Sequence, residues 1–189
     1  MNTPQIIYLH GFCSSPASAK SRLLGDYMAG HGLADSFVCP QLSTVPDEVI
    51  ADISVLIEAA DGPLTLVGSS LGGHYATCLA EKYGLNAVLT NPAVVNGLDP
   101  AAFVGEHANF HTGERFMFTA QHAEQLAAQV RRPTPGRYWL LCETGDEVLD
   151  WRQAAEFYAG CRQTVLPGGD HSFTQFAEFM PQIIEFSGL

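Results

Sequence analysis

Short runs of apolar residues alternate with amphipathic segments along most of the chain, and this pattern predicts an α/β protein. Unbroken hydrophobic runs are typical of strands in a parallel sheet that is covered on both faces. Six segments have this character: 5–10, 37–40, 64–67, 86–90, 137–142 and 163–166. Segments with helical spacing of apolar residues lie between or after them, at 17–29, 47–60, 73–82, 120–130, from about 151, and 173–186. The alternation indicates a doubly wound, mainly parallel sheet of about six strands with helices on both faces.

The stretch from about residue 92 to residue 135 interrupts this alternation. It contains three glycines, and its only convincing amphipathic helix is at 120–130. An insertion at this point, after the fourth predicted strand, is well placed to form a small cap over a site at the carboxyl ends of the strands. A chain of 189 residues is long enough for one domain with a sizeable core. We therefore expect a single domain over 1–189, with the cap inside it at about 92–135.

The motif G-x-S-x-G lies where a predicted strand gives way to a helix, in the sequence Leu-Thr-Leu-Val-Gly-Ser-Ser-Leu-Gly-Gly from Leu64 to Gly73. A serine hydroxyl is a weak nucleophile, so it must stand at the apex of a sharp turn where a base on another loop can reach it. Gly68 and Gly72 provide the room that such a turn needs on either side of Ser70. The motif predicts a nucleophile elbow at Ser70, although a strand-to-helix turn without chemistry would show the same letters.

A histidine and an aspartate follow Ser70 in the order that such an elbow requires. His171 lies in a glycine-rich loop after the last predicted strand, and Asp146 lies in the loop after the strand before it. Each of the three residues ends a separate strand, so their side chains are expected to meet at one edge of the sheet. Three other carboxylates compete for the role of the acid: Glu143, Glu147 and Asp150, of which Asp150 is better placed as a helix N-cap.

Two backbone amides are candidates for binding the oxyanion that such a serine generates. The amide of Leu71 directly follows the nucleophile at a helix N-terminus, and the amide of Phe12 follows the first strand in a His-Gly-Phe turn. Cys13 has no elbow and no local base, so it is not expected to be the nucleophile, but it lies beside the site and is a candidate for substrate contact. His10 either braces this loop or contacts substrate, and His74, one turn after Ser70, either contacts substrate or packs beneath the cap.

Charge and cysteine content limit the range of partners. The net charge of −11 and the pI of about 4.8 argue against nucleic acid and anionic membranes. Five cysteines fall mostly inside apolar runs, as reduced core residues do, and no apolar run is long enough to span a bilayer. We expect a cytoplasmic protein that acts on a small molecule. His107, His111 and His122 lack a supporting ligand pattern, so no metal is expected, and the chemistry needs no cofactor.

The same residues make the chain resemble the YqiA-type esterases, a compact branch of the α/β-hydrolase superfamily. The motifs that carry the resemblance, over nearly the whole length, are Tyr8-Leu9-His10-Gly11-Phe12 with Ser14-Ser15-Pro16, Val67-Gly68-Ser69-Ser70-Leu71-Gly72-Gly73, Asn91-Pro92-Ala93, Thr144-Gly145-Asp146-Glu147-Val148-Leu149-Asp150 and Gly168-Gly169-Asp170-His171-Ser172-Phe173. The resemblance implies a three-layer α/β-hydrolase fold, a Ser70, His171 and Asp146 triad, and hydrolysis of carboxylic esters, with acyl thioesters as a further class. Cys13 and His74 depart from the residues expected of the family, an asparagine and an aromatic residue, which affects substrate preference more than mechanism.

Two alternatives share the predicted fold. A catalytically idle α/β-hydrolase domain could bind a small molecule or a protein, although such domains usually lose a triad residue or an elbow glycine. The same triad could also hydrolyse a C–C or peptide bond. Substrate preference depends on the cap and pocket, and neither these nor the oligomeric state can be read from the sequence.

Overall fold

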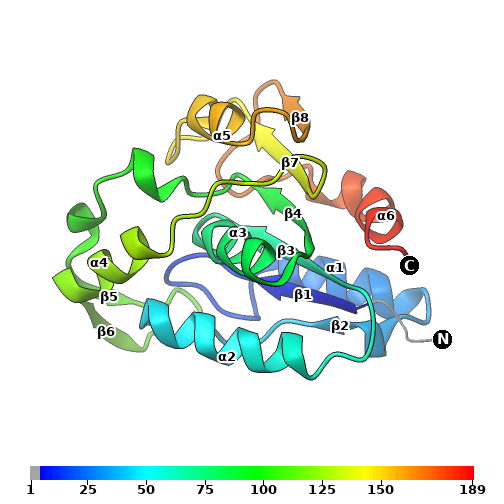
Figure 1. The fold of residues 1–189 in the computed structure, drawn as a ribbon, viewed down its shortest axis with the longest axis horizontal. Helices are drawn as coiled ribbons and strands as arrows, with labels where there is room; N and C mark the ends of the chain where they lie inside the picture. The colour runs from blue at the N-terminus through cyan, green and yellow to red at the C-terminus, as the bar shows by residue number, and fades with distance from the viewer. Residues whose placement is uncertain (1–4) are drawn as a thin grey trace.

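The computed structural model describes residues 5–189 and places a six-stranded sheet at the centre of the fold (Figure 1). Every neighbouring pair of strands in this sheet is parallel, which confirms the predicted α/β class. In spatial order the strands are β2 (Phe37–Val38), β1 (Gln5–Leu9), β3 (Leu64–Ser69), β4 (Asn86–Thr90), β7 (Tyr138–Glu143) and β8 (Arg162–Leu166). Chain order reverses between β1 and β3, and this is the position at which open parallel sheets bind ligands beyond the carboxyl ends of their strands.

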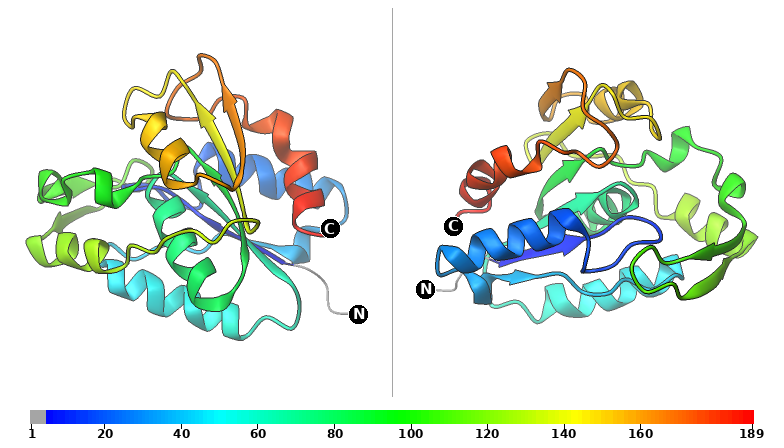
Figure 2. Two further views of the ribbon diagram at one scale, coloured as in Figure 1. Left: turned by 45° about the horizontal axis from the view of Figure 1, so that its top comes forward. Right: turned by 180° about the vertical axis from the view of Figure 1, so that it is seen from behind.

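Helices cover both faces of the sheet, as the sequence predicts. One face packs against α1 (Ala19–Gly30) and α6 (Phe176–Phe186), which lie side by side on the same side of the sheet in both views of Figure 2. The opposite face packs against α2 (Pro46–Glu58), α3 (Leu71–Tyr83) and α5 (Trp151–Phe157). No helix among residues 5–189 is long and apolar enough to cross a membrane.

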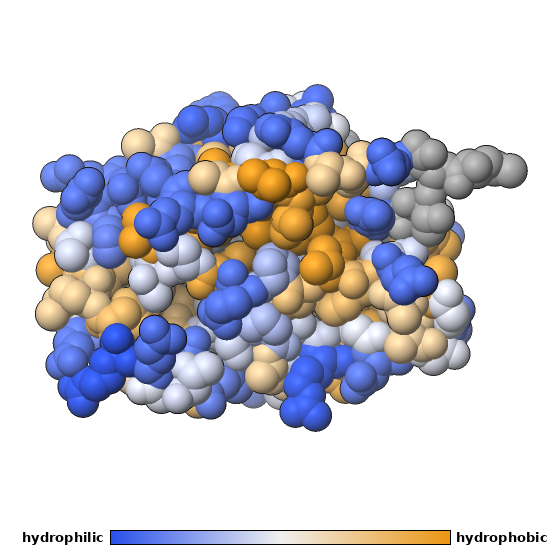
Figure 3. Space-filling model, turned by 90° about the horizontal axis from the view of Figure 1, so that it is seen from below, coloured by the Kyte–Doolittle hydropathy of each residue, from blue (hydrophilic) through white to orange (hydrophobic). Residues whose placement is uncertain are grey.

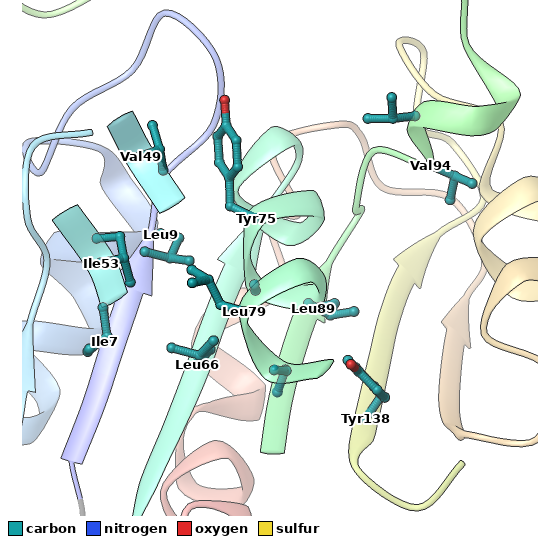
Figure 4. Packing of buried hydrophobic residues seen from close by; sticks show 14 of the residues in the cluster. Ile7, Leu9, Val49, Ile53, Leu66, Tyr75, Leu79, Leu89, Val94 and Tyr138 are labelled. Carbon is teal, nitrogen blue, oxygen red and sulfur yellow. The ribbon is translucent and has the colours of Figure 1, made fainter. Parts of the chain in front are cut away.

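Alternation along the buried strands divides the core between the two faces. Ile7 and Leu9 of β1 join the cluster on the α2 and α3 face, whereas Ile6 and Tyr8 join the cluster on the α1 and α6 face. Figure 4 shows side chains of α2, β1, β3 and α3 gathered in the first cluster. All six residues of β3 are buried, and so are all six of β7, which makes the central strands a rigid support for the loops that follow them.

The segment between β4 and β7 contains more structure than the sequence predicts. The helix predicted at 120–130 is present as α4 (Ala120–Ala128), but β5 (Gly105–Ala108) and β6 (Arg115–Phe118) also form an antiparallel hairpin. Short 3₁₀ turns at Val95–Gly97 and Pro100–Phe103 precede the hairpin. The strands of this hairpin are only four residues long, and the charged and polar residues within them hide the alternation that would have predicted them.

The predicted start of the terminal helix at Phe173 is wrong, because α6 begins at Phe176. Phe173 has a positive φ of 54°, which a helix does not allow, and its ring is fully buried against the α1 and α6 side of the sheet. Burial of this aromatic ring overrides the local helical pattern. The loop that carries His171 therefore extends to residue 175.

Exposed apolar side chains occur away from the carboxyl edge of the sheet as well. Figure 3 views the face that carries β2 and α2 and shows hydrophobic residues gathered on the part of it nearer the termini. Exposed large apolar residues of these two elements are Val38, Val55 and Leu56. Exposed apolar residues are common on protein surfaces, so by themselves these three carry no functional argument.

Candidate active site

Ser70 occupies the sharp turn between β3 and α3, as the motif predicts. Its backbone has φ 54° and ψ −122°, an uncommon conformation for a residue with a side chain. The turn is held by a hydrogen bond from the amide of Ser70 to the carbonyl of Thr90 (3.1 Å). The carbonyl of Ser70 in turn accepts from the amides of Gly73 and Ala93 (2.9 Å each). These backbone hydrogen bonds keep Ser70 in this conformation and direct its side chain away from the strand.

The two elbow glycines are required by close backbone approach. A Cβ on Gly68 would lie 2.5 Å from the carbonyl oxygen of Gly72, inside any real contact distance. A Cβ on Gly72 would overlap the carbonyl oxygen of Leu9 and lie 2.6 Å from that of His10, at the end of β1. The N-terminus of α3 can therefore pack closely against β3 at Gly68 and against β1 at Gly72 only because both positions lack a side chain, which confirms the reason given for this spacing.

Ser70, His171 and Asp146 form one hydrogen-bonded chain. His171 Nε2 is 3.1 Å from Ser70 Oγ, and His171 Nδ1 is 2.8 Å from Asp146 Oδ2 and 3.0 Å from Oδ1. The Asp146 side chain is almost fully buried, at 1% exposure, whereas that of His171 keeps 22%. A carboxylate only accepts hydrogen bonds, so Nδ1 carries the proton and Nε2 is free to accept from the serine hydroxyl.

Asp146 is held in its ionised form by its surroundings. Burial raises its pKa, but hydrogen bonds from His171 and from the amides of Leu149 and Val148 outweigh burial, so the pKa lies below its ordinary value. The hydrogen bonds from the amides of Leu149 (2.8 Å) and Val148 (2.9 Å) also fix the carboxylate in place. Asp146 is thus charged throughout the neutral range and oriented toward His171.

The other three carboxylates considered for the role of the acid form hydrogen bonds that hold the surrounding backbone instead. Glu143 is fully buried and accepts hydrogen bonds from the amides of Asp170 (2.8 Å) and Gln175 (3.3 Å). Glu147 accepts from the amide of His171 at 2.9 Å. Asp150 accepts from the amide of Arg152 at 3.0 Å and is the N-cap of α5, which confirms its predicted role.

The loop that carries His171 is further anchored by two residues whose roles the sequence did not indicate. Asn91, at 3% exposure, donates to the carbonyls of Asp170 (2.9 Å) and His171 (3.3 Å) and accepts from the amide of Glu143 (2.9 Å). Lys20 of α1 donates to the carbonyl of Ser172 at 2.5 Å, and burial lowers its pKa to about 8 against the opposing effect of nearby carboxylates. An Asn-Pro pair after a strand was the only signal for Asn91, and nothing in the sequence marked Lys20.

The two candidate oxyanion donors belong to segments that lie close to Ser70. Leu71 begins α3, and Phe12 lies in the loop after β1, where Gly11 packs so close that a Cβ on it would be 3.3 Å from Cβ of Ser70. Within residues 5–189 no protein acceptor is found for the amide of Phe12 or for that of Leu71. Both donors are therefore available to a ligand beside the serine.

A cavity of about 450 Å³ opens above Ser70 and is mainly apolar. His171, Phe12 and Leu71 line it beside the serine, and the 92–135 segment contributes much of the remaining wall. The apolar side chains that line it away from the serine are Val95, Leu98, Phe103, Phe110, Phe118, Leu126, Val148 and Leu149. The dimensions suit a small organic ligand with an apolar portion.

The three further residues considered for substrate contact do not line this cavity. His10 is a brace: its Nδ1 donates to the carbonyl of Gly11 (3.0 Å), its Nε2 accepts from the amide of Leu42 (3.2 Å), and burial lowers its pKa. His74 is buried beneath the segment between β4 and β7, and burial lowers its pKa to about 4. Cys13 faces a second cavity of about 370 Å³ on the other side of its loop, and burial raises the pKa of its thiol.

Of the other histidines singled out in the sequence, His111 lines the cavity above Ser70, whereas His107 and His122 have structural roles. His107 donates to the carbonyl of Phe103 (2.6 Å), and His122 belongs to the capping box of α4. Within the described residues no group of three or more potential ligands could hold a metal ion. All five cysteines are free thiols.

Six parallel strands in this order, helices on both faces and a serine at the strand-to-helix turn after β3 define the α/β-hydrolase fold. Solved structures of other proteins have a similar fold. Est1E from Butyrivibrio proteoclasticus is 14% identical with a TM-score of 0.74, covering 100% of this chain and 90% of its own. Alpha/beta hydrolase domain-containing protein 10 from mouse is 19% identical with a TM-score of 0.72, covering 97% and 88%. A monoacylglycerol lipase of Paleococcus ferrophilus is 17% identical with a TM-score of 0.66, covering 99% and 96%.

The family model of the uncharacterised protein family UPF0227 matches residues 5–188. The chain belongs to this family, which is the YqiA family that its motifs resemble.

Proposed function

We propose that this protein is a serine hydrolase of carboxylic esters that works through an acyl-enzyme on Ser70. The observation that carries the proposal is the hydrogen-bonded chain from Ser70 through His171 to Asp146, beside two amides that have no protein acceptor among residues 5–189. The fold is shared with esterases and lipases, which supports the same chemistry here.

Each group has one task in the proposed reaction. Ser70 Oγ attacks the ester carbonyl while His171 Nε2 takes its proton, and Asp146 holds the imidazole tautomer and stabilises the imidazolium. The amides of Leu71 and Phe12 bind the oxyanion of the tetrahedral intermediate. His171 then protonates the departing alcohol, and the same imidazole activates the water that releases the acid.

The apolar cavity favours an ester whose acyl part is a hydrocarbon. Its lining offers aliphatic and aromatic side chains away from the serine, whereas Lys20 is the one cationic side chain on it among the described residues. Acyl thioesters present the same carbonyl to Ser70 and are a second substrate class. The net charge of −11 does not favour a polyanionic carrier such as acyl-CoA over a neutral ester.

The test is hydrolysis of p-nitrophenyl esters of increasing acyl length by the wild type, Ser70→Ala and His171→Gln. His31→Gln is the matched control, because His31 is an exposed histidine at the end of α1, away from the cavity. We expect kcat to fall by about 10⁴-fold or more in the first two variants and to stay at the wild-type value in the control. Hydrolysis that persists in Ser70→Ala contradicts the proposal, and an inactive wild type favours a non-catalytic binding protein.

A further inference from the structure

The loop that carries the Phe12 amide is held by the tip of the β5–β6 hairpin, a contact between segments far apart in sequence. The amide of Phe110 donates to the carbonyl of Cys13 at 2.7 Å, and the side-chain amide of Asn109 donates to the carbonyl of Ser14 at 2.7 Å. These carbonyls belong to the two residues that directly follow Phe12. Holding both of them restricts the backbone of the loop and so limits where the Phe12 amide can point.

The loop needs such external support. Cys13 has a φ of 55°, a left-handed conformation that costs a residue with a side chain on the order of 1 kcal/mol or more. The loop belongs to no strand or helix and lies between β1 and α1. A strained backbone of this kind persists only where its surroundings hold it.

Both polar atoms of the Asn109 side chain form hydrogen bonds at this contact. Its Oδ1 accepts from the amides of His111 (2.9 Å) and Thr112 (3.1 Å), which closes the hairpin turn, while its Nδ2 reaches across to Ser14. A short amide side chain is well suited to this arrangement, because it offers an acceptor and a donor at a fixed separation. Asn109 thus ties the turn of the hairpin rigidly to the loop.

The Phe12 ring makes a second connection to the same hairpin. Its centroid lies 4.8 Å from that of His107, 5.7 Å from Phe116 and 5.4 Å from Phe118, all edge to face. Both the backbone and the side chain of the Phe12 loop are therefore set by the hairpin. Phe110 and His111 at the tip also line the cavity above Ser70, so a substrate bound in that cavity would lie against the element that holds the loop.

We propose that Asn109 is a positioning residue that holds the Phe12 amide in place for the oxyanion and so couples the hairpin to the chemical step. The proposal rests on the proposed function. It assigns Asn109 a role in the transition states and the tetrahedral intermediate, because the oxyanion is present there and not in the bound ester, and little role in binding the ester before reaction.

The deciding variant is Asn109→Asp. It keeps an oxygen for the turn but replaces the donor to Ser14 with a second acceptor, which repels the carbonyl. Thr112→Ala is the matched control: Thr112 Oγ1 accepts from the amide of Glu114 in the same turn, and its side chain makes no hydrogen bond to the loop. Asn109→Ala, which loses both side-chain groups, is a second test. Thermal midpoints of all three variants show whether the hairpin and the domain remain folded.

The readouts separate the oxyanion from ordinary binding. A trifluoromethyl ketone reports on the oxyanion, because Ser70 Oγ adds to its carbonyl carbon, the hydroxyl proton passes to His171 Nε2 and the carbonyl oxygen becomes the anion. The methyl ketone of the same chain length measures binding without that charge. For Asn109→Asp we expect kcat to fall and the inhibition constant of the trifluoromethyl ketone to rise, each by about 10-fold or more. The KM of Asn109→Asp and its affinity for the methyl ketone should stay within about 3-fold of the wild-type values. The Thr112→Ala enzyme should stay within about 3-fold of the wild type in all of these measurements.

The outcomes distinguish this inference from the function on which it rests. If the wild type is active and binds the trifluoromethyl ketone, but Asn109→Asp matches Thr112→Ala in both measurements, the role of Asn109 is overturned and the esterase stands. A loss confined to KM overturns it too. If the wild type neither hydrolyses esters nor binds the trifluoromethyl ketone, both proposals fail together.

Discussion

Replacement of Asn91 tests how much the His171 loop depends on a residue that touches no substrate. Asn91 is buried at 3% exposure, and its side chain joins three backbone groups: it donates to the carbonyls of Asp170 and His171 and accepts from the amide of Glu143. It does not line the cavity above Ser70. Asn91→Ala removes all three hydrogen bonds without changing any group at the reacting centre.

The cost can be worked from the groups that are left without partners. The Glu143 amide loses its partner at 2.9 Å, and a buried polar group left unpaired costs about 1–3 kcal/mol. The Asp170 carbonyl loses one hydrogen bond at 2.9 Å but keeps the one from the amide of Phe173 at 3.1 Å, so its loss is that of an ordinary hydrogen bond, about 0.5–1.5 kcal/mol. We therefore expect the free energy of unfolding to fall by about 1.5–4.5 kcal/mol. A displacement of about 1 Å at the histidine can lower kcat by as much as 10²-fold, and KM should change little. Asn91→Asp should be at least as damaging, because a carboxylate oxygen would then face the two carbonyls.

The assay is urea unfolding together with ester hydrolysis, on Asn91→Ala and on Asn96→Ala as a matched control. Asn96 is an exposed asparagine a few residues along the same segment, where a substitution should change stability by no more than about 0.5 kcal/mol. The reasoning is refuted if Asn91→Ala unfolds at the same urea concentration as Asn96→Ala and keeps the wild-type kcat. A rise in KM alone would also refute it, since it would place Asn91 in substrate binding.

Two further predictions concern the elbow and the acid. Gly72→Ala should lower the free energy of unfolding by about 1–3 kcal/mol and abolish most ester hydrolysis, because its Cβ would lie 2.6 Å from the carbonyl oxygen of His10. In Gly30→Ala the added Cβ meets nothing within 4 Å, so this control should keep both its stability in urea titration and its rate of ester hydrolysis. The pKa of Asp146 is lower in the folded than in the unfolded protein, so its charge stabilises the fold above about pH 4, and this contribution is lost as pH falls through the folded pKa. Urea unfolding from pH 7 to pH 3 should therefore show a steeper loss of stability in the wild type than in Asp146→Asn, and equal slopes would contradict the assigned pKa shift.

The sequence predicts those parts of the molecule in which local pattern and tertiary structure agree. The buried strands are continuous hydrophobic runs because both faces of the sheet are covered, and their order brings Ser70, Asp146 and His171 to one edge. The elbow is recognisable because steric contact, not function, demands Gly68 and Gly72. These features can be predicted because each leaves a local pattern in the sequence, a continuous apolar run or a glycine on either side of the serine.

The features that the sequence does not reveal depend on contacts between distant segments. The hairpin of β5 and β6 has short strands, and its importance lies in hydrogen bonds from Asn109 and Phe110 to a loop about 95 residues earlier. Phe173 leaves the predicted helix because its ring is buried in the core. Glu143 could be weighed only as a competing acid, since its hydrogen bonds to the loop of His171 become visible only in three dimensions.

The most direct test of the central claim is to identify the residue that a fluorophosphonate modifies. A fluorophosphonate reacts when an activated serine displaces fluoride and forms a covalent phosphonyl ester, so it requires the nucleophile and its base but no knowledge of the natural substrate. Peptide mass spectrometry of the treated wild type should place one phosphonyl group on Ser70, with no labelling in Ser70→Ala and strongly reduced labelling in His171→Gln. Labelling at another residue, or a wild type that stays unmodified while folded, would contradict Ser70 as the nucleophile.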